Sequence, residues 1–479
     1  MTRLNVVWTL VITSLALFMV VLDNLVVSTA LPVIRVELGA SIEELEWTVN
    51  AYTLTFAVFL LTGAALGDRF GRRRMFAAGL AVFTAASAAA ALAPSMDALI
   101  AARAVQGVGG ALVMPLTLTI ISGAFPAGRR GAALGLWGAV GGMAVAGGPL
   151  VGGVVIEGLA WQWIFWLNVP IGLVLAPLAL LRLRESHGPD RSLDLPGLAF
   201  VSGGLLGLVW GIVNGHGQGW TSVPVAASLA TGAVLLLAFV GWERHATRPM
   251  LPLRFFRDRA FAAGNAAGLL MTFGMFGAIF LLTQFFQTAQ GLSPLDAGLR
   301  ILPWTVMPIV VAPIAGALSD RIGGRPLLAA GLALQALGLA WNAAVTTPEI
   351  GYGSLVGPFV LAGIGMGLFF APLANIVLSS VRPEEEGKAS GANSAVREVG
   401  GVLGVAVLAS VFAQTGGYDS AATFVDGLVP ATYVGAAVVA AGALAALAVP
   451  RRGPRPQTTG AAPALAASAS PTHRKEILA

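Results

Sequence analysis

Long apolar segments joined by short polar connections run through almost the whole chain. A helix needs about 20 such residues to cross the apolar core of a bilayer. The seventh and eighth segments are short and meet at a glycine-rich turn at 214–219. We expect an all-α integral membrane protein with fourteen transmembrane helices, at residues 8–30, 47–67, 75–93, 98–122, 131–156, 163–181, 195–214, 223–243, 261–286, 296–318, 326–346, 354–378, 389–413 and 429–449.

Two copies of a charged, glycine-bearing turn indicate an internal duplication. Gly-Asp-Arg-Phe-Gly-Arg-Arg-Arg at 67–74 joins the second and third predicted helices, and Asp-Arg-Ile-Gly-Gly-Arg at 320–325 joins the tenth and eleventh. Such repeats are common in transporters whose two halves rock about a central site. The predicted units are an N-terminal six-helix bundle at 1–181, a linker with two additional helices at 182–260, a C-terminal six-helix bundle at 261–449 and a disordered cytoplasmic tail at 450–479.

Composition argues against a soluble enzyme. The chain is 56% hydrophobic and only 11% charged, with a mean hydropathy of +0.82, whereas ordinary globular proteins carry about 25% charged residues. Because the chain has no cysteine, disulfides and thiolate metal sites are excluded, and its four histidines are scattered. We therefore expect no enzymatic activity, no cofactor and no metal.

The net charge of +5 is better explained by membrane topology than by a nucleic-acid partner. If the helices alternate from a cytoplasmic N-terminus, all but four of the 28 Lys and Arg residues fall in cytoplasmic segments or in the tail. Acidic residues such as Glu37, Glu43 and Glu44 fall on the opposite side. This sorting requires an even number of helices and places both termini in the cytoplasm.

The turn at 67–74 resembles the loop-2/3 signature of the major facilitator superfamily. Asp68 can cap neighbouring helix ends and pair with arginines, which would hold one conformation of a transporter until rocking breaks the contacts. A plain positive-inside anchor would need neither the aspartate nor the glycines. The second copy lacks the arginine run, so we expect it to hold less strongly. The latch candidates are Gly67, Asp68, Arg69, Gly71, Arg72, Arg73, Asp320, Arg321 and Arg325.

The fourth and fifth predicted helices carry two further resemblances to the superfamily. Residues 103–110 resemble its second motif and place Arg103 inside a span, where a charge is expected to act on a cavity wall. The alternative is that Arg103 snorkels to the outer surface. The Gly-Pro-Leu-Val-Gly-Gly stretch resembles the signature of antiporters, in which small residues allow close helix packing and proline bends the helix. Its candidate residues are Gly148, Pro149, Gly152 and Gly153.

The first helix resembles the motif of fourteen-helix drug:proton antiporters of the QacA/EmrB-like branch over residues 22–32. Leu25 and Ser28 replace the usual Thr and Asn of that motif. Asp23 lies deep in the apolar run, where a carboxylate can gain and lose a proton near physiological pH. The alternative is a permanent ion pair with Arg103, and the two states can alternate.

The thirteenth helix offers a second polar group. Asn393 and Arg397 are one turn apart and share a face, whereas Glu398 points about 100° away. Glu398 is a candidate second protonation site or cation contact; alternatively, Arg397 and Glu398 are solvated near the helix start. The candidate proton-coupling residues are thus Asp23, Arg103 and Glu398. The substrate-cavity candidates are Asn24, Gln106, Asn265, Gln284, Asn393 and Arg397.

Two more stretches, at 161–172 and 249–261, resemble the start of the family's sixth helix and the link after its inserted helices. The resemblance as a whole implies a monomeric multidrug or antibiotic exporter of the bacterial inner membrane, driven by the proton gradient through alternating access. Its partners would be lipophilic small molecules, protons and membrane lipids. The alternatives are an exporter of one endogenous metabolite, an uptake symporter on the same fold, and a non-transporting receptor or scaffold.

Overall fold

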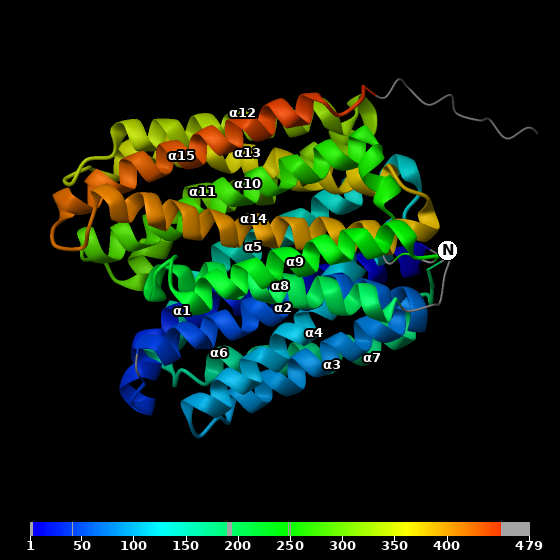
Figure 1. Cartoon of the computed structure of the whole chain (residues 1–479), viewed down its shortest axis with the longest axis horizontal. Helices are drawn as coiled ribbons and strands as arrows, with labels where there is room; N and C mark the ends of the chain where they lie inside the picture. Colours follow the sequence, from blue (N-terminus) through cyan, green and yellow to red (C-terminus); the bar gives the residue numbers. More distant parts are fainter. Residues whose placement is uncertain (1–2, 41, 189–193, 248, 250, 452–479) are drawn as a thin grey trace, which may run out of the picture.

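The computed structural model describes residues 3–40, 42–188, 194–247, 249 and 251–451, and this part of the chain is helical without strands (Figure 1). Fourteen of its helical segments are long and apolar enough to span a membrane, which confirms the predicted number. Most of the predicted tail at 450–479 lies outside the described residues.

The N-terminal half packs as one group of helices, with α2 and α3 both against α4 and with α1 against α5. Its sixth span is broken at Leu167, so that it consists of a short α6 followed by α7. The elements of this half are α1 (Arg3–Leu38), α2 (Ile42–Phe70), α3 (Arg72–Ala91), α4 (Met96–Ala124), α5 (Ala127–Gly158), α6 (Trp163–Trp166) and α7 (Asn168–Arg182).

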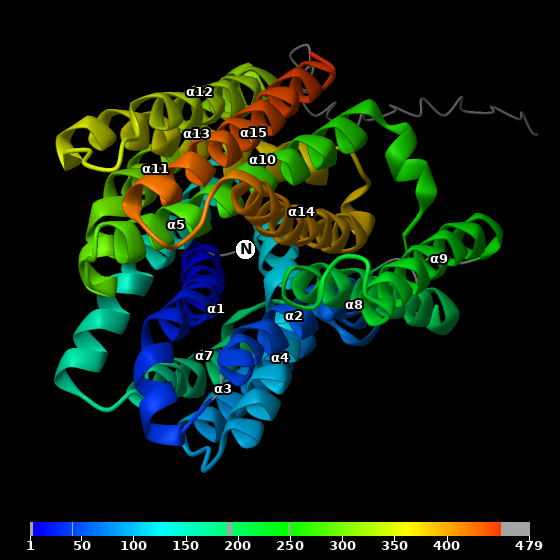
Figure 2. The same ribbon diagram turned by 60° about the vertical axis from the view of Figure 1, so that its left-hand side comes forward.

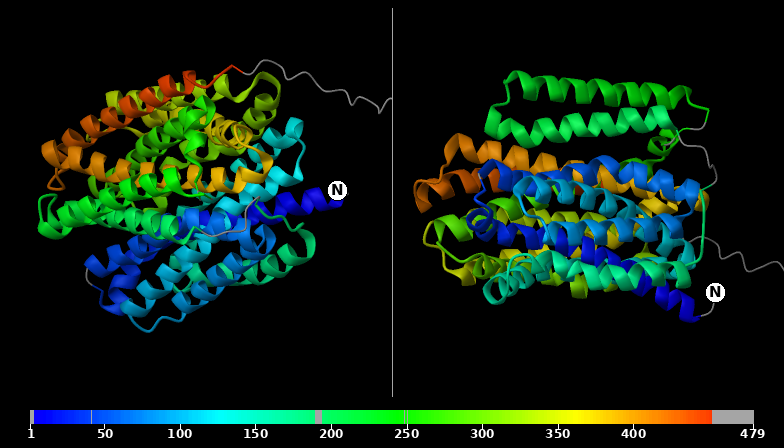
Figure 3. Two further views of the ribbon diagram at one scale, coloured as in Figure 1. Left: turned by 45° about the vertical axis from the view of Figure 1, so that its right-hand side comes forward. Right: turned by 90° about the horizontal axis from the view of Figure 1, so that it is seen from below.

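A hairpin of two helices, α8 (Leu195–Gln218) and α9 (Val223–His245), separates the halves in the sequence and lies outside both of them (Figure 3). The C-terminal half then forms the second group of helices (Figure 2). Its elements are the 3-10 helix η1 (Leu253–Arg257), α10 (Arg259–Gln284), the π-helix η2 (Phe285–Ala289), α11 (Pro294–Ile322), α12 (Gly324–Val345), α13 (Tyr352–Ser379), the 3-10 helix η3 (Pro383–Glu385), α14 (Glu386–Thr415) and α15 (Ala421–Leu447).

Several helices are longer than their apolar segments predict. The first helix continues to Leu38, and α15 already begins at Ala421, where the Ser420 hydroxyl accepts a hydrogen bond from the backbone N–H of Thr423 at 3.1 Å. The glycine-rich turn expected at 214–219 is wrong over most of its length, because α8 remains helical to Gln218. A helix satisfies its own backbone groups, so glycines near the edge of a membrane need not end it.

We call the end of the molecule that carries the two charged turns the basic end, and the opposite end the acidic end. The two halves meet chiefly where α5 packs against α11 along most of their length. Gly131 faces Gly316 near the basic end, and Gly153 faces Leu295 near the acidic end. Between them, a Cβ atom on Gly142 would lie 3.0 Å from Pro308 Cβ. The missing side chains therefore allow the two backbones to approach closely.

A small apolar cluster closes the seam between the halves near the basic end. It joins buried residues of α1, α4 and α5 to buried residues of α13, among them Leu17, Leu118, Trp137, Ala371 and Leu378. Because it contains residues of both halves, it packs them against each other through apolar side chains at this level. The described conformation is therefore closed at the basic end.

Single cysteines test the predicted topology in this cysteine-free chain. Asp97→Cys and Asp419→Cys lie at exposed positions of the acidic end, and Arg129→Cys and Arg382→Cys at exposed positions of the basic end. We expect an impermeant maleimide to label the first pair in intact cells and the second pair only after permeabilisation. Labelling of positions 382 and 419 from the same side would show that α14 does not span the membrane.

Candidate functional site

Asp23 is the centre of a buried polar network inside the N-terminal half. The residue is 2% exposed, and its side chain accepts three hydrogen bonds. Oδ2 accepts from the Arg103 guanidinium at 2.6 Å, and Oδ1 accepts from the amides of Gln106 at 2.8 Å and Asn168 at 2.7 Å. Such donors stabilise a carboxylate that has lost its hydration. The structure thus brings together two predicted proton-coupling residues, Asp23 and Arg103.

Arg103 is fully buried, so it lies inside the bundle and not at the outer surface. Its Nε donates to the Thr48 carbonyl at 3.2 Å, and its NH1 donates to Gln106 Oε1 at 2.8 Å as well as to Asp23. The guanidinium carbon also lies 4.3 Å from the centroid of the Tyr52 ring, within range of a cation–π interaction. Arg103 therefore has other partners besides the carboxylate of Asp23.

Asn168 is a member of this network that sequence reasoning missed. It is the first residue of α7, directly after the break at Leu167, and it is 2% exposed. Its amide also donates to the Ser87 hydroxyl at 3.1 Å, which in turn donates to the Phe165 carbonyl at 2.9 Å. The available signal was an amide inside the largely apolar stretch at 161–172, which also contains Gln162. Its partner could not be read from that signal.

The polar residues of the C-terminal half form a separate group. The Asn393 amide donates to Asn265 Oδ1 at 3.1 Å, and the Asn265 amide donates to the Phe261 carbonyl at 2.9 Å. The Arg397 guanidinium carbon lies 5.6 Å from the centroid of the Phe370 ring, and its Nε is buried without a partner among the described residues. The structure does not bring this group into contact with Asp23.

Three remaining candidates occupy less connected positions. Glu398 is partly buried, and its carboxylate has no hydrogen bond or ion pair within the part of the chain that the structure describes. Asn24 is partly buried beside Asp23. Gln284 accepts a hydrogen bond from the Tyr418 hydroxyl at 2.8 Å and so lies near the acidic end. Their predicted roles in proton coupling or the substrate cavity remain predictions.

The first charged turn holds the end of α2 against the other half of the molecule. Asp68 is 2% exposed, and its Oδ1 accepts from Arg72 Nε at 2.9 Å. Arg72 NH2 donates in addition to the Glu384 carbonyl of the C-terminal half at 3.2 Å. Gly71 has a φ of 107°, a conformation that favours glycine. Gly67 is buried against Leu116, and Arg69 lies over the Phe70 ring.

Glu185, in the linker after α7, ties down the arginine run and was also missed. Its Oε1 accepts from the backbone N–H of Arg73 at 2.9 Å, and its Oε2 lies 3.5 Å from Arg73 Nε and 3.7 Å from Arg74 Nε. A Cβ atom at Gly71 would lie 2.6 Å from the Glu185 carboxyl carbon. The glycine therefore serves close packing as well as backbone conformation.

The second charged turn makes the more direct contacts between the halves. Asp320, at the end of α11, accepts hydrogen bonds from the backbone N–H groups of Gly131 at 3.0 Å and Ala132 at 3.1 Å, both in α5. A further ion pair between the halves lies at the same end: Arg130 of α5 donates to the buried carboxylate of Glu386, at the start of α14, at 2.9 Å. Thus the second turn is not the less connected one, contrary to the expectation from its shorter arginine run.

Arg321 and Arg325, the other two candidates of the second turn, make no ion pair among the described residues. Arg321 is exposed and Arg325 is partly buried. The contacts between the halves at this turn therefore come from the carboxylate of Asp320 and not from the arginines.

The antiporter-like glycines of α5 lie between α1 and α11. A Cβ atom on Gly148 would lie 2.6 Å from Leu25 Cβ, two residues along α1 from Asp23, and one on Gly153 would lie 2.9 Å from a methyl carbon of Leu295. Gly152 is buried. The side chain of Pro149 lies outside the described residues. The glycines thus permit tight packing beside the Asp23 network.

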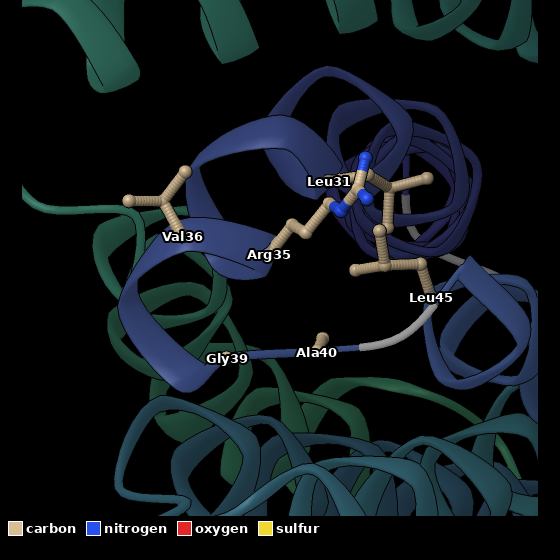
Figure 4. Close-up of a pocket in the computed structure, with 6 residues that line it drawn as sticks. All are labelled: Leu31, Arg35, Val36, Gly39, Ala40 and Leu45. Atoms are coloured by element: carbon tan, nitrogen blue, oxygen red, sulfur yellow. The ribbon is translucent and has the colours of Figure 1, made fainter.

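A cavity of about 580 Å³ opens at the acidic end, at the outer end of α1 (Figure 4). It is lined by Leu31, Arg35, Val36, Gly39, Ala40 and Leu45, and Figure 4 shows the Arg35 side chain directed toward Leu31 and Leu45. Arg35 lies twelve residues after Asp23, about 18 Å along a helix. The cavity is therefore outside the Asp23 network. Within the described residues, no cluster of His, Asp or Glu suits a metal ion.

Comparison with known proteins identifies the family. The sequence profile of the Major Facilitator Superfamily matches residues 13–405 and again 264–478, so the chain belongs to this superfamily. The cephamycin export protein CmcT of Amycolatopsis lactamdurans is 41% identical over 84% of both chains. The tetracenomycin C resistance and export protein of Streptomyces glaucescens is 35% identical over 85% of this chain and 76% of its own length.

Solved structures share the fold at low sequence identity. The proton:xylose symporter XylE matches with a TM-score of 0.66 and 14% identity over 93% of this chain and 95% of its own. The human organic anion transporter MFSD10 matches with a TM-score of 0.64 and 15% identity over 93% of this chain and all of its own. These similarities support the arrangement of two helix bundles and nothing about substrates.

The Asp23 network predicts a role for Asn168 in transport. Asn168→Leu removes one hydrogen bond to the carboxylate, and bonds to charged groups contribute about 1.5–3 kcal/mol. We expect export in vesicles to fall about tenfold or more, while Gln218→Leu, at an exposed amide of α8, leaves it unchanged. Unchanged export by folded Asn168→Leu would contradict the role.

The two charged turns predict an ordering of effects on the closed state. We expect Asp320→Ala to open the basic end at least as far as Asp68→Ala, because each lost contact between the halves contributes about 1–3 kcal/mol, or up to about a hundredfold in population. Spin labels at positions 129 and 382 report the distance between the halves. Asp426→Ala, at an exposed acid near the acidic end, is the control. A distance distribution that stays closed in Asp320→Ala would refute the latch.

Proposed function

We propose that the chain is a proton-coupled exporter of antibiotics or other lipophilic drugs in the bacterial inner membrane, with its basic end in the cytoplasm. The observation that carries this proposal is the buried carboxylate of Asp23, held by three donors inside one bundle of a transporter fold. The relatives named for export of cephamycin and tetracenomycin C support the substrate class. These relatives are named for export and not for signalling or catalysis.

Asp23 suits proton coupling because the surrounding side chains provide hydrogen-bond partners in both of its protonation states. When ionised, its carboxylate has Arg103, Gln106 and Asn168 as donors. When a proton from the outside binds to a carboxylate oxygen, Arg103 keeps the Thr48 carbonyl, the Gln106 carbonyl oxygen and the Tyr52 ring as partners. In the protonated state these neutral partners partly compensate the buried guanidinium charge, which would be strongly unfavourable without them.

The proton and the substrate then share one conformational cycle. With the basic end closed, as in this structure, protons reach Asp23 from the acidic end and substrate leaves. Opening of the contacts made by Asp320, Arg130 and Arg72 exposes the interface between the two bundles to the cytoplasm, where the proton dissociates and a new substrate binds. Each charge that crosses ~150 mV gains about 3.5 kcal/mol, enough for a gradient of a few hundredfold per proton.

A second candidate function is export of one endogenous metabolite. Relatives named for a single compound, such as the probable actinorhodin transporter of Streptomyces coelicolor, which is 36% identical, favour this possibility. Growth of a pump-deleted host that expresses the chain, on a panel including cephamycin, tetracenomycin C and puromycin, separates the two functions. Resistance to several unrelated compounds supports the multidrug exporter, and resistance to one supports the specific exporter.

The proposal also covers the energy source, the orientation in the membrane and the oligomeric state of the protein. Transport uses the proton gradient and no cofactor, both termini face the cytoplasm, and one chain is sufficient. The two bundles of a single chain already contain the Asp23 network and both charged turns. Membrane lipids and lipophilic small molecules are then its partners, together with protons.

Neutralisation of Asp23 tests the proton-coupling step. We expect Asp23→Asn to abolish export driven by an imposed pH gradient in vesicles, because the amide cannot bind and release the proton. Downhill exchange of labelled for unlabelled substrate should continue, since it needs no net proton movement. The control is Asp426→Asn. If Asp23→Asn exports as the unchanged protein does, another group carries the proton.

A further inference from the structure

An apolar groove lies between the inserted hairpin and the seam of the two halves. Its volume is about 260 Å³, and all of its lining residues are apolar. They come from α2, α8, α9, the segment around η1, α10 and α14, and include Leu61, Leu205, Val240, Phe256, Leu269 and Val399. Figure 2 shows the hairpin beside α2 and α14. We infer that this groove binds an acyl chain of an anionic phospholipid from the leaflet at the basic end.

The lining determines what the groove can hold. A polar or charged compound would find no side chain there with which to form a hydrogen bond, and burial of such groups without partners is unfavourable. An acyl chain needs no such partner. From Ala392 to Val399 the wall follows two turns of α14, about 10 Å. The groove thus runs from Phe256, near the basic end, toward the middle of the membrane.

Cationic side chains lie at the basic end of the groove. Arg257 and Arg259 flank the exposed Asp258, are themselves exposed, and make no ion pair among the described residues. Asp258 uses its carboxylate to cap α10, accepting from the backbone N–H groups of Ala260 and Phe261. The two arginines are therefore available to a phosphate group, as expected of basic residues beside a membrane surface that binds anionic lipid.

The groove has walls from both halves, so its shape depends on the conformation. Gly391 of α14 packs against Leu61 and Ala64 of α2 beside it. The hairpin is attached to α2, because the hydroxyls of Thr62 on α2 and Ser202 on α8 lie 3.4 Å apart, and we expect it to move with α2. When the basic end opens, α2 and α14 separate and the groove loses a wall. A lipid in the groove therefore stabilises the closed state.

The segment around η1 is instead attached to the start of α14, and we expect it to move with that helix. Arg254 pairs with Glu385, and Lys388 Nζ donates to the Pro249 carbonyl at 2.6 Å. The hairpin with its connecting segment thus spans the seam, with one attachment on each side. Movement of the halves relative to each other must change the distance between these attachments and with it the groove.

Photo-crosslinking of the purified full chain in nanodiscs tests the site. The probe is phosphatidylglycerol with a diazirine on its acyl chain, and the neutral comparison is phosphatidylcholine with the same group. We expect crosslinks to α8, α9 and α14. Val399→Trp, or the milder Leu205→Phe should the former not fold, reduces them about tenfold by filling the groove. Leu337→Trp, at an exposed position of α12, leaves them unchanged.

The headgroup and the conformational effect have separate readouts. Arg257→Gln with Arg259→Gln should lower labelling by phosphatidylglycerol about tenfold and leave labelling by phosphatidylcholine unchanged, with Arg451→Gln as control. Phosphatidylglycerol should also narrow the distance between spin labels at 129 and 382 toward the closed value, and Val399→Trp should remove that effect. Labelling spread evenly over the outer helices, or unaffected by Val399→Trp, overturns the site. Labelling by a drug analogue in place of lipid assigns the groove to substrate.

Discussion

A charged carboxylate inside a membrane bundle must find all of its partners within the protein, and the N-terminal half is arranged around this requirement. Asp23 on α1 depends on donors from α4 and from the first residue of α7. The break before Asn168 brings its amide to the carboxylate, and the hydroxyl of Ser87 on α3 orients that amide. One carboxylate thus links α1, α4 and α7 directly and α3 through Asn168, so a change in its charge acts on four helices of this half.

The contact between the halves follows a different principle. Along α5 and α11 it consists of glycines and small residues, which attract through close packing and offer few specific bonds. Among the described residues, the polar contacts between the halves lie toward the basic end, where Asp320, Arg130 and Arg72 cross the seam and Ser390 donates to the Pro115 carbonyl. The two halves can rock about such an interface, because the packed surfaces of α5 and α11 can shift against each other. Only the hydrogen bonds and ion pairs at the basic end must then break. The approximate symmetry is visible here: an aspartate at the end of α2 and one at the end of α11 each face the start of a helix in the other half.

The inserted hairpin of α8 and α9 is a third group of helices beside the two halves. It packs on α2 and α14 and not on the remaining helices of either half to the same degree, so it covers one side of the seam. The opposite side is closed by α5 and α11 themselves. The membrane face of the molecule is consequently asymmetric: one side is a tight helix pair, and the other contains an apolar groove beside a basic segment.

The sequence by itself determined the number of spans, since a membrane forces apolar length and polar connections separate the segments. It also indicated the duplication, through the two charged turns, and marked Asp23 and Arg103 as candidates, because a charge in an apolar run stands out. Only the tertiary structure decided which of these residues meet. Asn168 lies 145 residues from Asp23, and Glu185 lies 112 residues from Arg73. Such pairs depend on helix rotation and on where helices break, which residue type does not encode. The direct contacts of Asp320 with the other half likewise follow from its position opposite α5 and not from its neighbours in the sequence.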